Sequence, residues 1–119
     1  MTPSEELAER IRAEIGGMPG VSELRMMGGL CFMHHGNMVV ATMKNGDLLA
    51  RVGAEGFDAA LKRPGAGHVQ MAERQMKGFV NVDQAVLDDR TLKDWISTSL
   101  AFVGPMPRKA KKATPKRKG

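Results

Sequence analysis

The dipeptide Asn45-Gly46 is the strongest turn signal in the chain. Asn-Gly favours a type I′ turn, in which both residues adopt positive φ and which joins two antiparallel strands. The segments on either side, residues 39–43 and 48–52, are mostly apolar and suit strands. The sequence therefore predicts a β-hairpin around residues 45 and 46.

Other short apolar segments predict further strands. Residues 21–27 alternate in part, and residues 30–34 are apolar enough to pair with the strands of the first hairpin. Together these segments predict an antiparallel meander of three or four strands. Later in the chain, residues 68–71 and 77–82 predict a second hairpin.

The beginning of the chain predicts a helix. Thr2 and Glu5 fit a capping box, and Pro3 suits the first helical position. Apolar residues at four-residue spacing predict the buried side, namely Leu7, Ile11 and Ile15. On the exposed side we expect ion pairs between charged residues at the same spacing: Glu6, Arg10 and Glu14.

Two more helices are predicted. Residues 54–62 place Phe57 and Leu61 on one side of a helix. A last helix begins after a cap at Asp88 or Asp89. Its buried side carries the apolar residues Leu92, Trp95, Ile96, Leu100 and Val103.

The order is thus helix, three or four strands, helix, two strands, helix. A single antiparallel sheet with helices on one face buries all these apolar sides, which predicts a two-layer α+β fold. A chain of 119 residues suits one domain. We place that domain at residues 1–104 and expect residues 105–119 to form a disordered basic tail.

The positive charge of the chain is concentrated at its end. Seven of the 18 Lys and Arg residues lie in the last twelve residues, which contain no acid, so the other 107 residues carry 11 positive and 13 negative charges. The seven cations are Arg108, Lys109, Lys111, Lys112, Lys116, Arg117 and Lys118. We expect them to bind nucleic acid through its phosphates without reading its sequence. A solubilising tail with no binding role is the alternative.

Several motifs occur in order along the chain: Arg25-Met26-Met27-Gly28-Gly29-Leu30, Phe32-Met33, Gly36-Asn37-Met38, Leu49-Ala50-Arg51-Val52-Gly53, Met76-Lys77-Gly78-Phe79-Val80 and the helix around Trp95. Together they resemble the N-terminal domain of the TfoX/Sxy family over residues 5–103. Relatives usually carry Phe where this chain has Met27, a departure that keeps the size and the apolar character of the side chain.

The resemblance implies a two-layer α/β fold. The best-known members of the family are bacterial competence regulators, which act as transcriptional coactivators together with a cyclic-AMP receptor protein. Those members have a second, C-terminal helical domain, and we expect this chain to be a stand-alone N-terminal domain without it. A regulatory role is therefore an expectation that the resemblance alone suggests.

Arg25, Gly28 and Gly29 form the first signature of the family, and Lys77 and Gly78 belong to the second. Paired glycines permit positive φ or a close backbone approach, so one interpretation is a tight turn or a bulge. The other is a backbone nest beside Arg25 that binds an anion or a partner's carboxylate. In the second signature, glycine suits close packing of a strand, and the lysine adds charge to a partner surface.

Catalysis and metal binding are not expected. Cys31, His34 and His35 are close in sequence, but neighbouring side chains on a strand point to opposite faces, and nothing orients a Cys–His pair. We therefore predict no catalytic residue, no metal ligand and no cofactor. With one cysteine and no apolar segment long enough to span a bilayer, we expect a cytoplasmic protein that does not associate with membranes.

Ten methionines compensate for the small number of aromatic residues. They are interpreted either as flexible core filler or as a Met-rich docking surface.

Three functional hypotheses follow. The first is a non-enzymatic protein-interaction module with a regulatory role, which meets an unidentified protein partner in transcriptional regulation. The second is a nucleic-acid-associated protein that binds non-specifically through its tail. The third is a small enzyme or ligand-binding domain built around Cys31. The oligomeric state stays open at this point.

Overall fold

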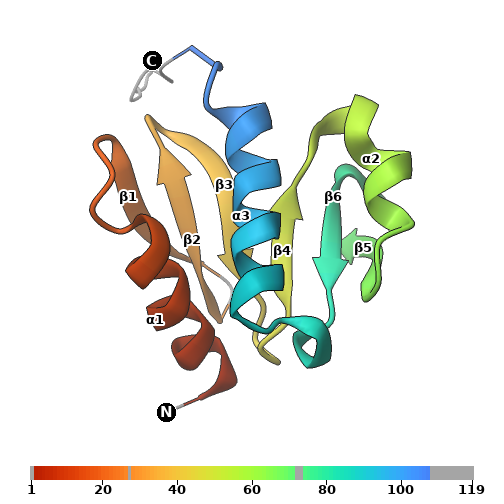
Figure 1. Ribbon diagram of the computed structural model, residues 1–119, viewed down its shortest axis with the longest axis horizontal. Helices are drawn as coiled ribbons and strands as arrows, with labels where there is room; N and C mark the ends of the chain where they lie inside the picture. The colour runs from red at the N-terminus through yellow and green to blue at the C-terminus, as the bar shows by residue number, and fades with distance from the viewer. Residues whose placement is uncertain (1, 27, 72–73, 108–119) are drawn as a thin grey trace, which may run out of the picture.

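A computed structural model of the chain describes residues 2–26, 28–71 and 74–107. The helices and strands follow the predicted order (Figure 1). They are α1 (Pro3–Ile15), β1 (Val21–Met26), β2 (Gly29–His34), β3 (Asn37–Thr42), β4 (Leu48–Arg51), α2 (Gly53–Leu61), β5 (Ala66–Met71), β6 (Arg74–Val82) and α3 (Asp89–Val103). A short 3-10 helix, η1 (Gln84–Val86), precedes α3 and was not predicted.

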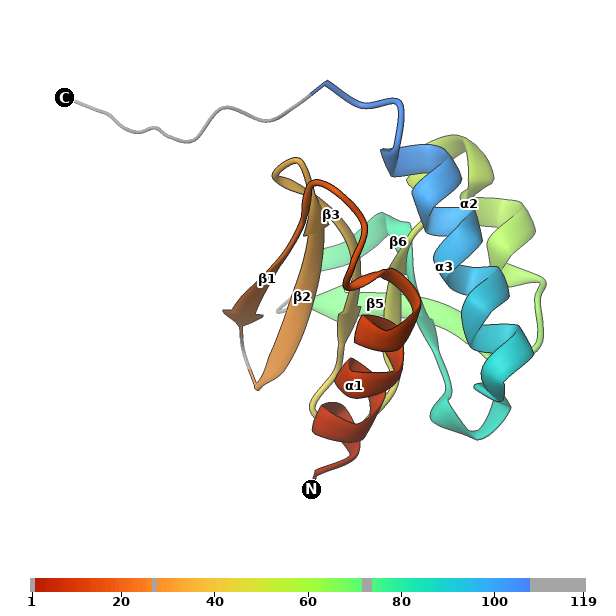
Figure 2. The ribbon, with the colours of Figure 1, turned by 60° about the vertical axis from the view of Figure 1, so that its left-hand side comes forward.

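All six described strands belong to one sheet, in the order β1-β2-β3-β4-β6-β5, and every neighbouring pair is antiparallel. The prediction of an α+β fold with an antiparallel sheet is therefore confirmed. The second hairpin extends the sheet because β6 pairs with β4, which leaves β1 and β5 at the two edges. Figure 1 shows β1 at one side of the molecule and the β5–β6 hairpin at the other, and Figure 2 shows β1 at the edge of the sheet.

The helices pack on one face of the sheet and bury the main core. α1 lies over β2 and β3, α3 lies over β3 and β4, and α2 lies over β5 and β6. In Figure 1, α1 and α3 cross in front of the sheet. The largest fully buried side chains of this core are Ile11, Phe32, Leu48, Leu92 and Trp95. Burial of this apolar area supplies most of the stability that such a fold has.

The helix caps are as predicted. Thr2 and Glu5 form the complete capping box at the start of α1. The Asp88 side chain accepts a hydrogen bond of 2.8 Å from the Thr91 N–H and so caps α3. Both caps are local sequence signals, because the capping side chain lies three residues from its partner.

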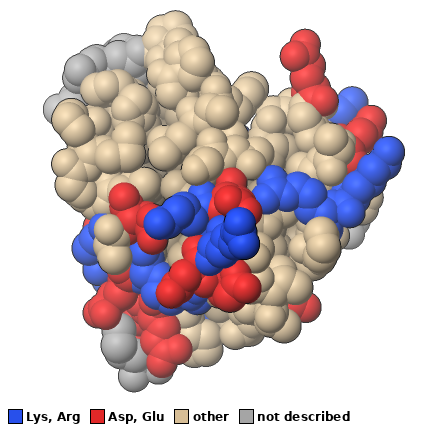
Figure 3. All heavy atoms as spheres, viewed as in Figure 1, with Lys and Arg blue, Asp and Glu red and all other residues tan. Residues whose placement is uncertain are grey.

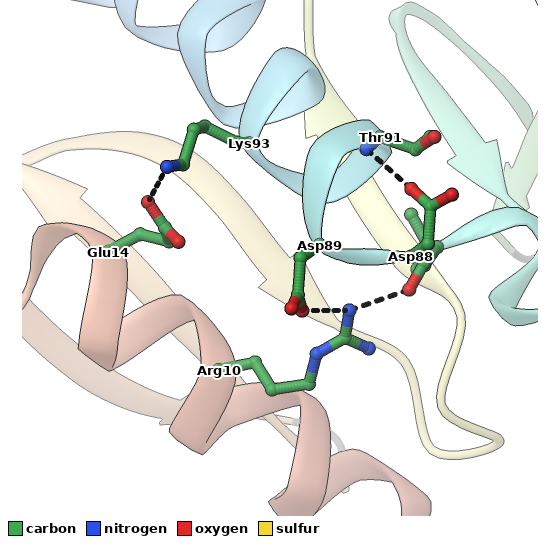
Figure 4. Close-up of polar contacts among 7 residues, drawn as sticks. Arg10, Glu14, Asp88, Asp89, Thr91 and Lys93 are labelled. Carbon is green, nitrogen blue, oxygen red and sulfur yellow. Dashed lines mark hydrogen bonds and ion pairs between the residues drawn. The ribbon is translucent and has the colours of Figure 1, made fainter.

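The charged residues of α1 pair differently from the prediction. Arg10 was expected to pair within its own helix, but it reaches α3 (Figure 4). It donates to the Leu87 carbonyl at 2.6 Å and forms an ion pair of 3.4 Å with Asp89. Glu14 forms an ion pair of 3.8 Å with Lys93, also on α3. These side chains link two helices that pack side by side.

The turn prediction was wrong in its details. Of the described residues other than glycine, His35 alone has a positive φ, 51°, and it is followed by Gly36 with a φ of 85°. These two residues form the two-residue turn between β2 and β3, the arrangement expected of a type I′ turn. The prediction had assigned that turn type to Asn45-Gly46, where only the glycine has a positive φ.

The loop at residues 43–47 is longer than a two-residue turn because hydrogen bonds within it hold it in another form. The Met43 carbonyl accepts from the Gly46 N–H, and the Met43 N–H donates to the Asp47 carbonyl. The Asn45 side chain accepts from the Asp47 N–H at 2.9 Å, which holds the loop in this form. The hairpin between β3 and β4 is therefore present as predicted, but a three-residue loop with a left-handed glycine closes it.

Contacts with the domain continue to Pro107, three residues past the predicted boundary at residue 104. Met106 packs against the main core, and the Asn37 side chain donates to the Pro107 carbonyl at 3.0 Å. The rest of the predicted tail, residues 108–119, lies outside the described residues. Among the described helices, none combines the length and the apolar character that crossing a membrane requires.

Candidate protein-interaction site

The β1–β2 hairpin has two different sides. Directly opposite residues of an antiparallel pair point to the same face of the sheet. Glu23 faces Phe32, which belongs to the main core under the helices, whereas Leu24 faces Cys31. Cys31 and Leu24 therefore belong to the other face of the sheet, which we call the helix-free face.

The helix-free face carries a second apolar cluster, and no residue of a described helix takes part in it. Its buried members come from β2, β3, β4 and β5, and half-buried methionine and phenylalanine side chains surround them. The buried members are Cys31, Ala41, Leu49 and Val69, and the surrounding residues are Met33, Met38, Met43 and Phe79. The cluster therefore extends across the helix-free face from β2 through β3, β4 and β6 to β5.

A hollow of about 170 Å³ opens on the helix-free face. Its lining is almost entirely apolar, with one cation at the edge. The lining residues include Met26, Cys31, Met38, Met43, Lys44 and Leu49. Next to the hollow, Leu24 and Met26 on β1 are 52% and 47% exposed, the largest values among the exposed large apolar residues of the described chain. An apolar surface of this kind is typical of a contact with another protein.

Arg51 adds a second cation to the same region. Its guanidinium lies 5.7 Å from the ring centres of both Phe79 on β6 and Phe102 on α3. The Arg51 side chain also donates a long hydrogen bond of 3.5 Å to the Met38 carbonyl. Together with Lys44, it gives the apolar surface a positive border.

The thiol of Cys31 is part of the apolar cluster. The residue is 2% exposed, and burial raises the pKa of its thiol. Its S–H donates to the Met33 sulfur at 3.4 Å. A buried thiol held in the protonated form is a poor nucleophile, so this environment favours a packing role for Cys31.

The predicted residues Arg25, Gly28 and Gly29 lie on the opposite side of the hairpin, under the start of α1. They line a cleft of about 510 Å³ together with residues of both charge signs, namely Glu5, Glu9 and Arg12. Gly28 has a φ of 84°, as a tight turn requires. A Cβ on Gly29 would collide with the Thr42 carbonyl oxygen, so a close backbone approach explains this glycine.

Figure 3, viewed from the helix side, shows positive and negative side chains intermixed over α1 and α3. The ion-paired residues Arg10 and Glu14 belong to α1, and their partners Asp89 and Lys93 belong to α3. Arg12 is also paired, since it donates two hydrogen bonds of 2.7 and 2.9 Å to Glu23. The helix side therefore offers a surface of mixed charge, in contrast to the apolar helix-free face.

Lys77 and Gly78 lie on β6, which β2, β3 and β4 separate from β1. Gly78 has a φ of 94°, and its carbonyl accepts a hydrogen bond of 2.8 Å from Val52, just before α2. Lys77 is exposed. The fold thus brings Arg25, Gly28 and Gly29 together in one cleft, whereas Lys77 and Gly78 lie elsewhere in the sheet.

The remaining predicted residues concern metal binding and the tail. Within the described ranges, no three side chains of His, Cys, Asp or Glu gather as a metal site would require. The rings of His34 and His35 lie 4.2 Å apart because the turn between β2 and β3 begins there. The seven cations of the tail lie outside the described residues.

Sequence reasoning did not place the residues of the helix-free face. The number of methionines was a signal, and a Met-rich docking surface was one of its two interpretations. Met33, Met38 and Met43 do lie together around the second cluster. Their gathering depends on the pairing of β2, β3 and β4, which composition does not reveal.

The fold and the surfaces define a class of protein: a small α+β domain whose sheet has helices on one face and, on the other, an apolar cluster in which no described helix takes part. The chain belongs to the TfoX N-terminal domain family, whose sequence profile matches residues 14–103. This match confirms the resemblance and begins near the end of α1. No curated protein and no solved structure matches the chain.

Proposed function

We propose that this protein is a non-enzymatic protein-interaction module with a regulatory role in transcription, acting in the cytoplasm. The observation that carries the proposal is the second apolar cluster on the helix-free face of the sheet. A sheet with helices on one face usually presents polar side chains on the other face. Here the other face presents methionine, leucine and phenylalanine side chains instead.

The chemistry of the surface indicates the kind of partner. Methionine side chains are flexible and polarizable, so a surface built from them adapts to apolar side chains of different shapes. Lys44 and Arg51 at its border favour a partner with acidic residues beside its apolar ones. The partner that fits is therefore a protein segment with an apolar side and an acidic flank.

Site-specific photo-crosslinking tests this proposal. A photoreactive amino acid replaces Met43, which lines the hollow on the helix-free face, and the full chain is irradiated in cells. The matched control carries the same group at Ala101, which is exposed on α3. We expect a protein adduct from position 43 and not from position 101, and mass spectrometry should identify a component of the transcription apparatus.

Either of two results would contradict the proposal. Adducts from position 101 alone would place the contact on the helix side. A small metabolite or a lipid bound at position 43, with no protein adduct, would favour a ligand-binding domain instead.

A second candidate function is non-specific nucleic-acid binding through the tail. The last twelve residues carry seven cations and no acid, whereas the rest of the chain carries a net charge of −2. An attraction to phosphates is therefore expected of the tail. If five to seven of these cations contact phosphates, log K for duplex DNA should fall with log salt at a slope of roughly −4 to −6.

Truncation after Pro107 tests the second candidate. The shortened chain should lose its affinity for duplex DNA, while the full chain binds random and regulatory sequences equally. If the shortened chain binds DNA with the same salt dependence as the full chain, the tail does not carry the binding.

A further inference from the structure

We infer that two copies of this chain associate through β1, so that their sheets join edge to edge in an antiparallel dimer. This inference does not rest on the proposed function. β1 ends the strand order, and no other described strand pairs with its outer side. Figure 2 shows it at the free edge of the sheet. A regular edge strand presents unpaired backbone groups that another strand can bind.

The register of β1 identifies which of its backbone groups face outward. The Gly20 carbonyl accepts a hydrogen bond of 2.9 Å from the His35 N–H, so residue 20 faces β2. Backbone groups of successive strand residues alternate between the two sides of the strand. Leu24 therefore faces β2 like residue 20, and the N–H and C=O groups of Glu23 and Arg25 point away from the sheet.

The side chains of these two outward-facing residues complement each other across a two-fold axis. When two copies of β1 run antiparallel with the axis at Leu24, Glu23 of each copy lies opposite Arg25 of the other. Each pair exchanges two backbone hydrogen bonds and places Arg25 beside the Glu23 carboxylate of the other copy, which Arg12 of that copy also binds. Opposite charges across the strands stabilise this pairing. A copy shifted along the strand by two residues would lose both charge pairs.

On the helix-free face, the same register brings apolar side chains together. Leu24 meets the second copy's Leu24 directly, and Met26 lies opposite Ser22. These leucine and methionine side chains are about half exposed in the single chain, so the dimer buries apolar surface that is otherwise in water. The two-fold axis is perpendicular to the sheet, so both apolar patches lie on one side of the joined sheet.

The described part of the chain leaves this edge accessible. α1 packs mainly over β2 and β3, so it does not cover the outer side of β1. Every residue of β1 after Val21 is exposed, and the six pairs with β2 follow one another without a bulge. The other edge strand, β5, has a register shift between His68 and Gln70, and such irregularities block edge pairing.

Disulfide trapping tests the dimer and its register. The variants carry Cys31→Ala, because Cys31 lies opposite Leu24 in the same chain and would compete for the bond. In this background, Leu24→Cys places two thiols directly across the two-fold axis. The control Ser22→Cys places them four residues apart along the strand, roughly 13 Å. We expect Leu24→Cys to form linked dimers at least about ten times faster than the control.

The mass of the full chain in solution provides the second measurement. Light scattering during gel filtration should give twice the mass of one chain and a smaller average mass at high salt. Arg25→Pro removes an outward N–H and leaves the pairing with β2 intact, whereas Arg25→Ala keeps that N–H. The proline variant should raise the dimer dissociation constant by at least about tenfold over the alanine variant.

Each outcome decides the inference. A monomer at every accessible concentration overturns it, as does equal trapping at positions 22 and 24. If circular dichroism shows that the Arg25→Pro variant is unfolded, the disulfide trapping experiment still decides whether two chains associate through β1. Linked dimers from Leu24→Cys together with a dimer of the unmodified chain support it.

Discussion

Gly29 and Gly56 are both glycines in regular structure, but their surroundings differ. A side chain on Gly29 would collide with the Thr42 carbonyl oxygen, which the neighbouring strand holds in place. Gly56 lies within α2, and a Cβ added there would meet no atom within 4 Å, so alanine fits without strain. The two positions separate a glycine that packing requires from one that it does not.

We predict opposite effects of alanine at these positions. Gly29→Ala should lower the free energy of unfolding by about 2 kcal/mol or more, because strand β2 must move away from β3. Gly56→Ala should raise it by about 0.5–1 kcal/mol, because alanine favours a helix. Urea denaturation of both variants measures the two changes. Equal stabilities would contradict the close approach at Gly29.

Thr98 and Ser99 make a second comparison on α3. The Thr98 hydroxyl accepts from Arg63 and donates to the Asp94 carbonyl, each at 3.0 Å. Ser99 is fully buried, and its hydroxyl has no hydrogen-bond partner among the described residues. A buried polar group without a partner costs free energy.

Removing the two hydroxyls should therefore have opposite results. Ser99→Ala should raise the free energy of unfolding by up to about 1 kcal/mol, since it removes an unpaired polar group. Thr98→Val should lower it by about 1 kcal/mol, since it breaks two hydrogen bonds and keeps the shape. Thermal unfolding of both variants tests the pair, and a loss of stability in Ser99→Ala would show that its hydroxyl is bonded.

At the scale of elements, the N-terminal cap of α3 makes stability depend on pH. Hydrogen bonding from Thr91 holds the pKa of the exposed Asp88 carboxyl below its ordinary value of 3.8. A group with a lowered pKa in the folded state stabilises the fold above its unfolded pKa and loses this effect as the pH falls. Glu5 at the start of α1 behaves in the same way, because hydrogen bonds with Thr2 lower its pKa.

We expect the urea midpoint to fall between about pH 5 and pH 3 as these caps become protonated. Asp88→Asn keeps a capping side chain that does not titrate, so it should reduce this dependence on pH. Asp88→Ala should lower the midpoint at neutral pH, where the asparagine variant stays close to the unmodified chain. Identical pH profiles for all three proteins would contradict the role of Asp88.

The elements that the sequence predicted well depend on neighbours in the chain. Thr2 and Asp88 each cap a helix through a residue three positions later, so the short pattern contains the whole signal. Arg10 contacts Asp89, 79 positions away, and its pairing within α1 was predicted wrongly because nothing local reveals α3. The type of turn at Asn45 was also wrong, because its side chain bonds to Asp47.

At the scale of the whole molecule, the strand order decides what the surface offers. The alternation of apolar residues predicted the strands, but not that β6 would pair with β4 and leave β1 at an edge. The apolar patch forms only when β2, β3 and β4 lie side by side, and it extends through β6 to Val69 on β5. Sequence reasoning correctly assigned Gly28 and Gly29 to a tight turn or a close backbone approach. It could not locate the apolar patch, because the patch depends on the long-range pairing of strands.

The proposed protein contact lies on the helix-free face, and methionine methyl NMR tests that placement most directly. The full chain is labelled at its methionine methyl groups and titrated with the protein that crosslinks to position 43. The signals of Met33, Met38 and Met43 should shift or broaden, while those of Met18, beyond α1, and Met106, in the main core, stay unchanged. Changes confined to Met18 and Met106 would contradict a contact on the helix-free face.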